Sequence, residues 1–174
     1  RVGINLGAPG DRVAPNGTLW LDYPSRGGPS PKLPVSIKPE NPEWFCHHSS
    51  LLESGELKWV AASGVKGIGK ITVILAEKPG KARPYTVRLY FAETCYAPQQ
   101  KSLAPRVFDL ALQGQNVLKG FDILTQAGGP NRTVVKEFKN ILVNRDLTLT
   151  FNSSSTINTN KPSICGIEII AESW

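Results

Sequence analysis

The chain has 174 residues, including 16 Gly, 14 Pro and 3 Cys, and a formal net charge of +6. This length suits one domain with its own apolar core, and the three scattered cysteines fit neither a CxxC zinc pattern nor a dense disulfide framework. The basic residues occur singly, with no run of five like charges, which favours a solvated surface. A dedicated anion-binding patch is the alternative.

The N-terminal third consists of short extended segments separated by turns. Residues 1–6 are expected to form a short strand, residues 18–23 a strand or an extended arm, and residues 35–37 another short strand. The Gly-, Pro- and Ser-rich segment 25–34 between them is expected to be an ordered surface loop. Residues 44–48, WFCHH, are the stretch densest in aromatic and imidazole groups.

In the rest of the chain, apolar residues alternate with polar ones. The clearest case is 85–93, where Tyr85, Val87, Leu89 and Phe91 share one face, as expected for a strand with one face buried. Further strands are expected over 70–75, 106–112, 133–138, 147–151 and 164–171, with a hairpin turn at 113–116. Cys165 alternates with apolar residues, which predicts a buried free thiol.

These segments amount to about eight or nine strands, and no window shows a long apolar period of 3.6 residues. The chain is therefore predicted to be all-β, with residues 1–174 forming a single two-sheet jelly-roll sandwich.

Several motifs carry a family resemblance. Asn5-Leu6-Gly7 near the start and PSICGIE at 162–168 near the end resemble the first and last strands of the malectin and malectin-like carbohydrate-binding domains. The central strands of that family resemble FAE at 91–93, RVFD at 106–109, QG at 113–114, VLK at 117–119 and FDI at 121–123. The resemblance runs in order along nearly the whole chain and implies a galactose-binding-like β-sandwich.

The resemblance also implies a sugar site. In malectin, loop aromatics and a carboxylate hold the ligand, and an aromatic pair follows the FAE strand. Here that pair is Cys95 and Tyr96, so only Tyr96 is kept, and Tyr23 corresponds to a second stacking aromatic. Asn160 occupies the position of the carboxylate, so we expect a sugar preference different from malectin's α-linked, glucose-containing oligosaccharide.

Three more residues are candidates for the same rim. Trp44 and Trp20 are aromatics in segments expected to be loops, and His48 lies near a further family aromatic. Flat apolar rings that stack on a pyranose, together with polar side chains that bind its hydroxyls, are what sugar recognition requires.

Two other classes of function remain open. A protein-interaction or scaffold module would use an exposed apolar patch around Trp44 and Phe45. A glycan-active enzyme would need a pair of carboxylates, but Glu93 and Asp109 lie in strands and are expected to be hydrogen-bonding scaffold groups. The only histidines, His47 and His48, would point to opposite faces of an extended segment, which is poor geometry for a shared metal.

We therefore expect a non-catalytic carbohydrate-binding module with no metal and no cofactor. Its expected partner is an oligosaccharide or polysaccharide, without nucleic-acid binding and without membrane insertion. The sequence contains no signal peptide and no transmembrane run, so we expect a module tethered to other domains of a larger secreted or periplasmic protein.

Overall fold

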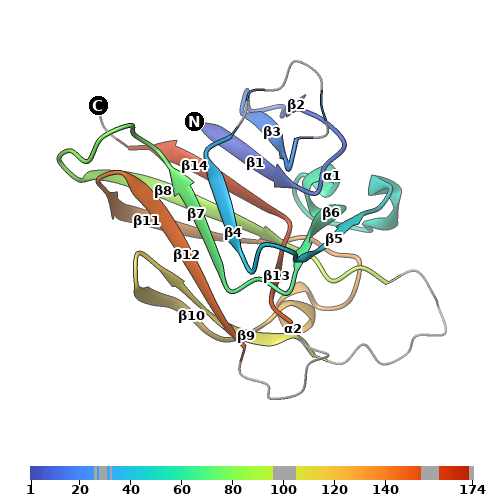
Figure 1. Ribbon diagram of the computed structural model, residues 1–174. Helices are drawn as coiled ribbons and strands as arrows, with labels where there is room; N and C mark the ends of the chain where they lie inside the picture. Colours follow the sequence, from blue (N-terminus) through green and yellow to red (C-terminus); the bar gives the residue numbers. More distant parts are fainter. Residues whose placement is uncertain (26, 28–30, 32, 96–104, 154–160, 173–174) are drawn as a thin grey trace.

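The computed structural model describes residues 1–25, 27, 31, 33–95, 105–153 and 161–172. These residues form an all-β sandwich, shown in Figure 1, which confirms the predicted fold class. The described strands form three sheets rather than two, and there are fourteen of them rather than eight or nine. The difference comes from two-residue strands and from a small third sheet, both too short to produce a repeating pattern in the sequence.

The larger sheet has six strands in the order β11-β8-β14-β1-β3-β2. Their bounds are β1 Val2–Leu6, β2 Arg12–Val13, β3 Leu19–Tyr23, β8 Arg83–Phe91, β11 Val134–Val143 and β14 Gly166–Ala171. All pairs are antiparallel except β1 with β3, which run parallel. The first and last strands therefore lie side by side inside this sheet.

The opposing sheet has five strands in the order β10-β9-β12-β7-β4. Their bounds are β4 Val35–Lys38, β7 Lys70–Ile74, β9 Val107–Leu112, β10 Gln115–Asp122 and β12 Asp146–Ser153. The predicted hairpin turn between β9 and β10 is confirmed, because Gln113 (φ 51°) and Gly114 (φ 79°) both adopt the left-handed conformation that a tight two-residue turn requires.

The third sheet and the helices are short. The sheet has the order β13-β6-β5, with β5 Glu43–Cys46, β6 Ser63–Lys66 and β13 Ser163–Ile164. The helical elements are η1 Ser49–Leu51, α1 Lys58–Ala61 and α2 Ile123–Ala127. None of the helices in the described part of the chain is long and apolar enough to cross a bilayer.

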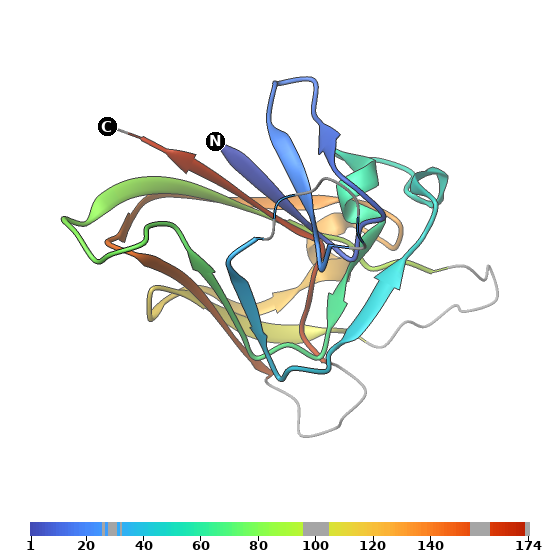
Figure 2. The same ribbon diagram turned by 45° about the horizontal axis from the view of Figure 1, so that its top comes forward.

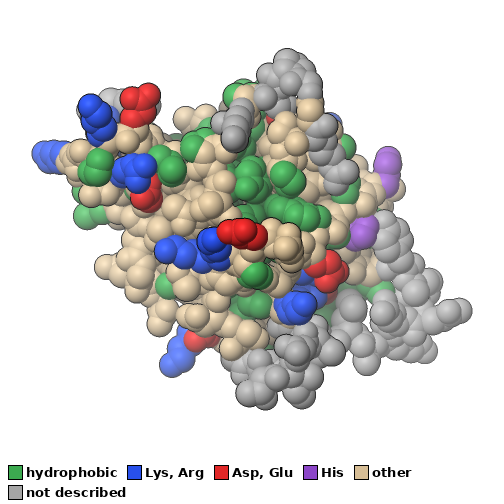
Figure 3. Space-filling model, in the orientation of Figure 1, with side chains coloured by type: hydrophobic (Ala, Val, Ile, Leu, Met, Phe, Trp, Pro, Cys, Tyr) green, Lys and Arg blue, Asp and Glu red, His purple; other side chains and the backbone are tan. Residues whose placement is uncertain are grey.

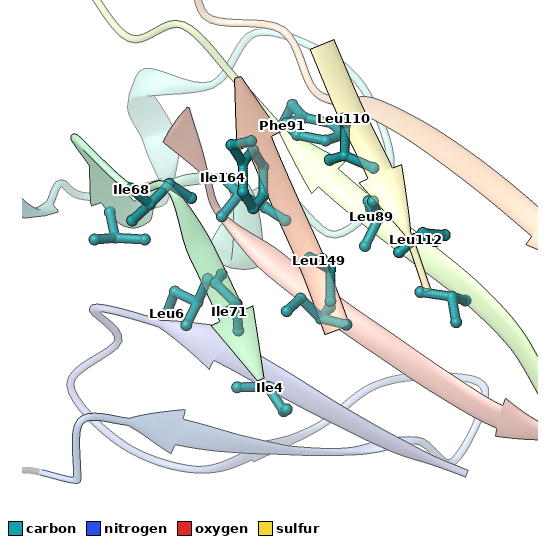
Figure 4. Packing of buried hydrophobic residues seen from close by; sticks show 14 of the residues in the cluster. Ile4, Leu6, Ile68, Ile71, Leu89, Phe91, Leu110, Leu112, Leu149 and Ile164 are labelled. Atoms are coloured by element: carbon teal, nitrogen blue, oxygen red, sulfur yellow. The ribbon is translucent and has the colours of Figure 1, made fainter. Parts of the chain in front are cut away.

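The main core fills the space between the two large sheets. Leu89 and Phe91 of β8 lie against Ile71 of β7 and Leu110 of β9, and all four are completely buried. Figure 4 shows these side chains pointing toward one another. The alternation in the sequence thus identified the inner face of β8 correctly.

A second core cluster covers the outer face of the six-stranded sheet, which the sequence did not predict. Tyr90 and Trp20 lie on this face with ring centroids 5.1 Å apart, and both are completely buried under Val60 of α1 and Leu52. The expectation that β8 would be buried on one face only was therefore wrong along its second half. Segment 51–62, which lacks a strong period of its own, supplies the cover.

Trp20 belongs to this cluster and not to a loop. Its ring lies directly on Gly3 of β1, where an added Cβ would come within 2.1 Å of it, and against Gly166 of β14. With no exposed surface, Trp20 cannot stack on a sugar, which corrects its assignment to the binding rim. The cause is that residues 19–23 form an inner strand of the sheet.

Candidate functional site

The three-stranded sheet brings together segments that are distant in the sequence. Lys66 of β6 pairs with Glu43 of β5 on one side and with Ser163 of β13 on the other. Two strand spacings, about 10 Å, therefore separate the segment that carries Trp44 from the segment that follows residue 160. Figure 2 shows β5 running beside β6 in this sheet.

Tyr23 and Trp44 form an aromatic pair beside this sheet. Their ring centroids are 6.1 Å apart at an interplanar angle of 61°, and both side chains are half-buried. The Tyr23 hydroxyl donates a 3.0 Å hydrogen bond to the Val35 carbonyl oxygen, which fixes the ring, and burial raises the pKa of Tyr23. The two rings thus keep a defined geometry while part of each remains exposed.

These two rings line an open hollow of about 350 Å³, and we call it the Tyr23–Trp44 hollow. Strand β4 supplies one wall of the hollow. The polar lining of the hollow includes Lys38 and Glu40, whose Nζ and Oε1 atoms form an ion pair at 2.6 Å. The Lys38 hydrogen bond and charge lower the pKa of the Glu40 carboxyl. The hollow therefore combines apolar ring surfaces with hydrogen-bond donors and acceptors.

Tyr96 and Asn160 lie outside the described residues, but their chain neighbours do not. The amide of Asn131 holds Cys95 at two points: its Oδ1 accepts from the Cys95 backbone N at 2.8 Å and its Nδ2 donates to the Cys95 O at 3.0 Å. The Lys161 side chain lies over Gly67, and the next residue accepts a backbone hydrogen bond from the Gly67 N.

Arg106 links these two segments. Its guanidinium forms a two-point ion pair with Glu93, with Nε–Oε2 at 2.7 Å and Nη2–Oε1 at 3.1 Å, and its Nη1 donates to the Lys161 carbonyl oxygen. Glu93 and Arg106 are mostly buried. One side chain thus ties the end of β8 to the strand after residue 160. Sequence reasoning missed this role, although Arg106 begins the RVFD motif.

His48 lies in a different hollow. That hollow, of about 360 Å³, is formed by Pro9, Arg12, His48 and Trp59 among others, and shares no lining residue with the Tyr23–Trp44 hollow. The His48 Nδ1 lies 2.7 Å from the Ser50 Oγ, where the ring caps η1. Figure 3 shows both histidine rings at the edge of the molecule. The described residues contain no group of three or more metal-ligating side chains.

The remaining predicted groups have structural contacts. Asp109 accepts a 2.7 Å hydrogen bond from the Gly120 N, and Glu93 holds Arg106, so both are scaffold groups as expected. Trp44 packs against the main core and Phe45 against the second cluster, and both are half-buried. Cys165 is the buried free thiol that the sequence predicted, and burial raises its pKa to about 12.

Comparison with known proteins decides the family. The profile of the malectin domain matches residues 79–167, which is just over half of the chain. The chain belongs to the malectin domain family. The matched region runs from the turn before β8 into β14, and it contains both Glu93 and Arg106.

Two curated relatives are plant receptor-like kinases. A probable leucine-rich repeat receptor-like serine/threonine-protein kinase of Arabidopsis thaliana is 36% identical over 67 residues, covering 37% of this chain and 7% of that protein. A second Arabidopsis kinase of this type is 39% identical over 56 residues, covering 31% of this chain and 6% of its own length. The malectin-family chain thus spans less than a tenth of either relative.

Solved structures share the fold over the whole chain. The extracellular domain of ANXUR2 from Arabidopsis thaliana superposes with a TM-score of 0.67 at 18% identity, covering 98% of this chain and 41% of that one. A β-glucuronidase of Bacteroides uniformis superposes with a TM-score of 0.70 at 12% identity, covering 99% of this chain and 18% of the enzyme. At these identities the likeness extends to the fold alone.

Proposed function

We propose that this malectin-family domain is a non-catalytic glycan-binding module whose site includes the Tyr23–Trp44 hollow. The observation that carries the proposal is the half-exposed aromatic pair over an open, polar-lined concavity. The C–H face of a pyranose stacks on such rings, and hydroxyls at its edge pair with planar or charged side chains. Lys38, Glu40 and Ser36 offer such partners at the Tyr23–Trp44 hollow.

Tyr96 and Asn160 remain candidates for the same rim. Their described neighbours Cys95 and Lys161 adjoin the group that Arg106 organises, and β6 connects that group to β5. This connectivity supports a binding surface that runs from the Tyr23–Trp44 hollow across the three-stranded sheet. An oligosaccharide of a few residues would suit it, with affinity on the order of micromolar to millimolar, because each wet hydrogen bond and each stacking contact contributes little.

We also propose that the domain works outside the cytoplasm as part of a larger protein. The support is its malectin-family membership, its short overlap with long receptor-like kinases, and its fold similarity to a domain described as extracellular. Binding a glycan at this domain would then place or regulate whatever other domains the protein carries.

The test is a glycan array followed by calorimetry on the best ligand. We expect Tyr23→Ala and Trp44→Ala each to weaken binding by about five- to twelvefold, since a lost stacking contact is worth about 1–1.5 kcal/mol. Trp59→Ala is the matched control, because Trp59 is a half-buried aromatic that lines the other hollow. Equal losses in all three variants, or unchanged binding in the first two, would refute this placement of the site.

A separate assay addresses catalysis. The binder is expected to release no reducing sugar from its ligand over long incubation. Release of reducing sugar by the unmodified chain that is lost in Glu40→Gln would instead show that this malectin-family domain is an enzyme. Glu40 is chosen because its carboxylate lines the Tyr23–Trp44 hollow.

A further inference from the structure

Three basic side chains of the segment 78–83 line one cavity at the turn between β7 and β8. The cavity has a volume of about 390 Å³ and is lined by nine residues, three of which are Lys78, Lys81 and Arg83. None of the described residues that line it is acidic. We call it the basic cavity. Figure 3 shows Lys and Arg side chains, with some acidic ones, gathered at this end of the molecule.

The charge of the basic cavity is not neutralised by its described surroundings. No ion pair is found for Lys78, Lys81 or Arg83 among the described residues. Glu77 precedes Lys78 in the same turn, is exposed and forms no ion pair among the described residues, and two carboxylates on adjoining segments are engaged elsewhere. Glu172 accepts from the Thr86 hydroxyl and the Asn140 N, and Asp146 pairs with Arg145 at 3.1 Å.

The floor of the basic cavity is apolar and aromatic. Tyr85, Leu75 and Val143 line it, and Tyr85 and Leu75 also pack against the main core. Core packing holds the Tyr85 ring in place, while Tyr85 remains partly exposed and lines the basic cavity. An aromatic floor with several cations around it suits a ring that has one apolar face and an anionic substituent.

We propose that the basic cavity binds an acidic saccharide, whose carboxylate or sulfate is held by Lys78, Lys81 and Arg83 while a sugar ring lies on Tyr85. Arg83 can bind either anion at two points, and the two lysines act as point charges. The basic cavity and the Tyr23–Trp44 hollow share no described lining residue. The two sites would therefore bind two separate saccharides, or two places on one polysaccharide.

An anionic lipid surface is the competing explanation of a basic patch. A membrane contact would favour a flat or protruding surface with apolar side chains that insert into the lipid. The basic cavity is instead concave, and its apolar groups form the floor. This geometry favours a saccharide.

The test compares three forms of the chain by calorimetry at about 0.15 M and 1 M salt. The first is the unmodified chain, the second carries K78Q, K81Q and R83Q, and the third carries K70Q, K119Q and K139Q. The third form is the matched control, because it also loses three exposed cations and none of them lines the basic cavity. The ligands are a uronic-acid oligosaccharide, a sulfated oligosaccharide and a neutral oligosaccharide of equal length.

We expect one or both acidic oligosaccharides to bind the unmodified chain and to bind the second form at least about tenfold more weakly, while the third form changes less than about twofold. Binding should also weaken strongly at 1 M salt, where the screening length falls to about 3 Å. Which acidic ligand binds identifies the carboxylate or the sulfate as the source of the charge.

Three outcomes would overturn the proposal. Equal losses of affinity in the second and third forms would mean a general charge effect. Equal affinity for the neutral and acidic oligosaccharides would mean that the cations do not recognise the carboxylate or sulfate group. Binding to vesicles containing phosphatidylserine, without binding to either acidic oligosaccharide, would favour the lipid instead. A neutral glycan that binds the Tyr23–Trp44 hollow should bind the first and second forms equally, which separates this result from the fate of that hollow.

Discussion

Arg106 and Glu93 form a two-point ion pair, with distances of 2.7 and 3.1 Å, that joins the two ends of the segment between β8 and β9. Because the side chain of Glu93 is only 6% exposed, removing its partner leaves a carboxylate with little access to water. We expect Arg106→Gln to lower the free energy of unfolding by about 3 kcal/mol. Urea denaturation measures this.

The matched control is Arg132→Gln, because Arg132 lies 3.7 Å from Glu53 and both side chains are exposed. That pair should contribute less than about 1 kcal/mol. Similar losses in the two variants would mean that burial does not strengthen the Arg106–Glu93 pair.

The raised pKa of the buried Cys165 thiol predicts that the free energy of unfolding falls at alkaline pH. Its pKa is about 12 in the folded chain, against an ordinary value of 9.0, so the folded state holds the thiol proton more tightly than the unfolded state does. This contribution is complete below pH 9 and disappears as the pH rises toward 12. Three pKa units correspond to about 4 kcal/mol as an upper limit.

The measurement is the free energy of unfolding between pH 8 and 12 in the unmodified chain and in Cys165→Ala. The variant should be less stable at pH 8, and its stability should fall less steeply above pH 9. Tyr90, whose pKa burial also raises, accounts for the part of the decline that remains. Parallel pH profiles for the two proteins would contradict the assignment to Cys165.

Gly3 is expected to be intolerant of any side chain. A Cβ at this position would come within 2.1 Å of the Trp20 ring, which is held on its other sides by Tyr90 and Trp59. We expect Gly3→Ala to cost about 3 kcal/mol, near the upper end for an overpacked core. The double variant with Trp20→Phe should cost less than the sum of the single changes, because the smaller ring makes room. Gly10→Ala is the control, since its surroundings are open.

Two substitutions of Tyr23 should distinguish its contribution to folding stability from its contribution to glycan binding. Tyr23→Phe removes the hydrogen bond to the Val35 carbonyl and keeps the ring, so we expect a loss of about 1 kcal/mol in unfolding free energy with glycan affinity changed less than threefold. Tyr23→Ala should lose the affinity as well. Thermal unfolding and calorimetry on both variants distinguish the two roles. A Phe variant that binds as poorly as the Ala variant would show that the hydroxyl, and not the ring, is what the ligand needs.

The sequence predicted the inner faces of the long strands because alternation is a local signal. Residues 85, 87, 89 and 91 were placed on one face, and the structure confirms that they pack in the main core. The outer cover of the six-stranded sheet was missed because it depends on contacts between Trp20 and residues more than thirty positions away, such as Val60 and Tyr90. Burial on that face could not be inferred from the polar neighbours of Tyr90.

The same limit applies to the candidate site. The aromatics expected at the rim include Tyr23 and Trp44, which the structure brings together, and Trp20, which it buries. The sequence contains no signal for the pairing of β5 with β6, which sets the position of Trp44 relative to Lys66. Nor did single basic residues reveal that Lys78, Lys81 and Arg83 surround one cavity.

The pairing of β1 with β14 has a consequence for how the domain is carried. Val2 lies opposite Ile169 in the middle of the six-stranded sheet, so the polypeptide enters and leaves at neighbouring points, as Figure 1 shows. Such a domain can be inserted into a surface loop of another domain without moving the two ends of that loop apart. Pulling on the two flanking segments would separate β1 from β14 first.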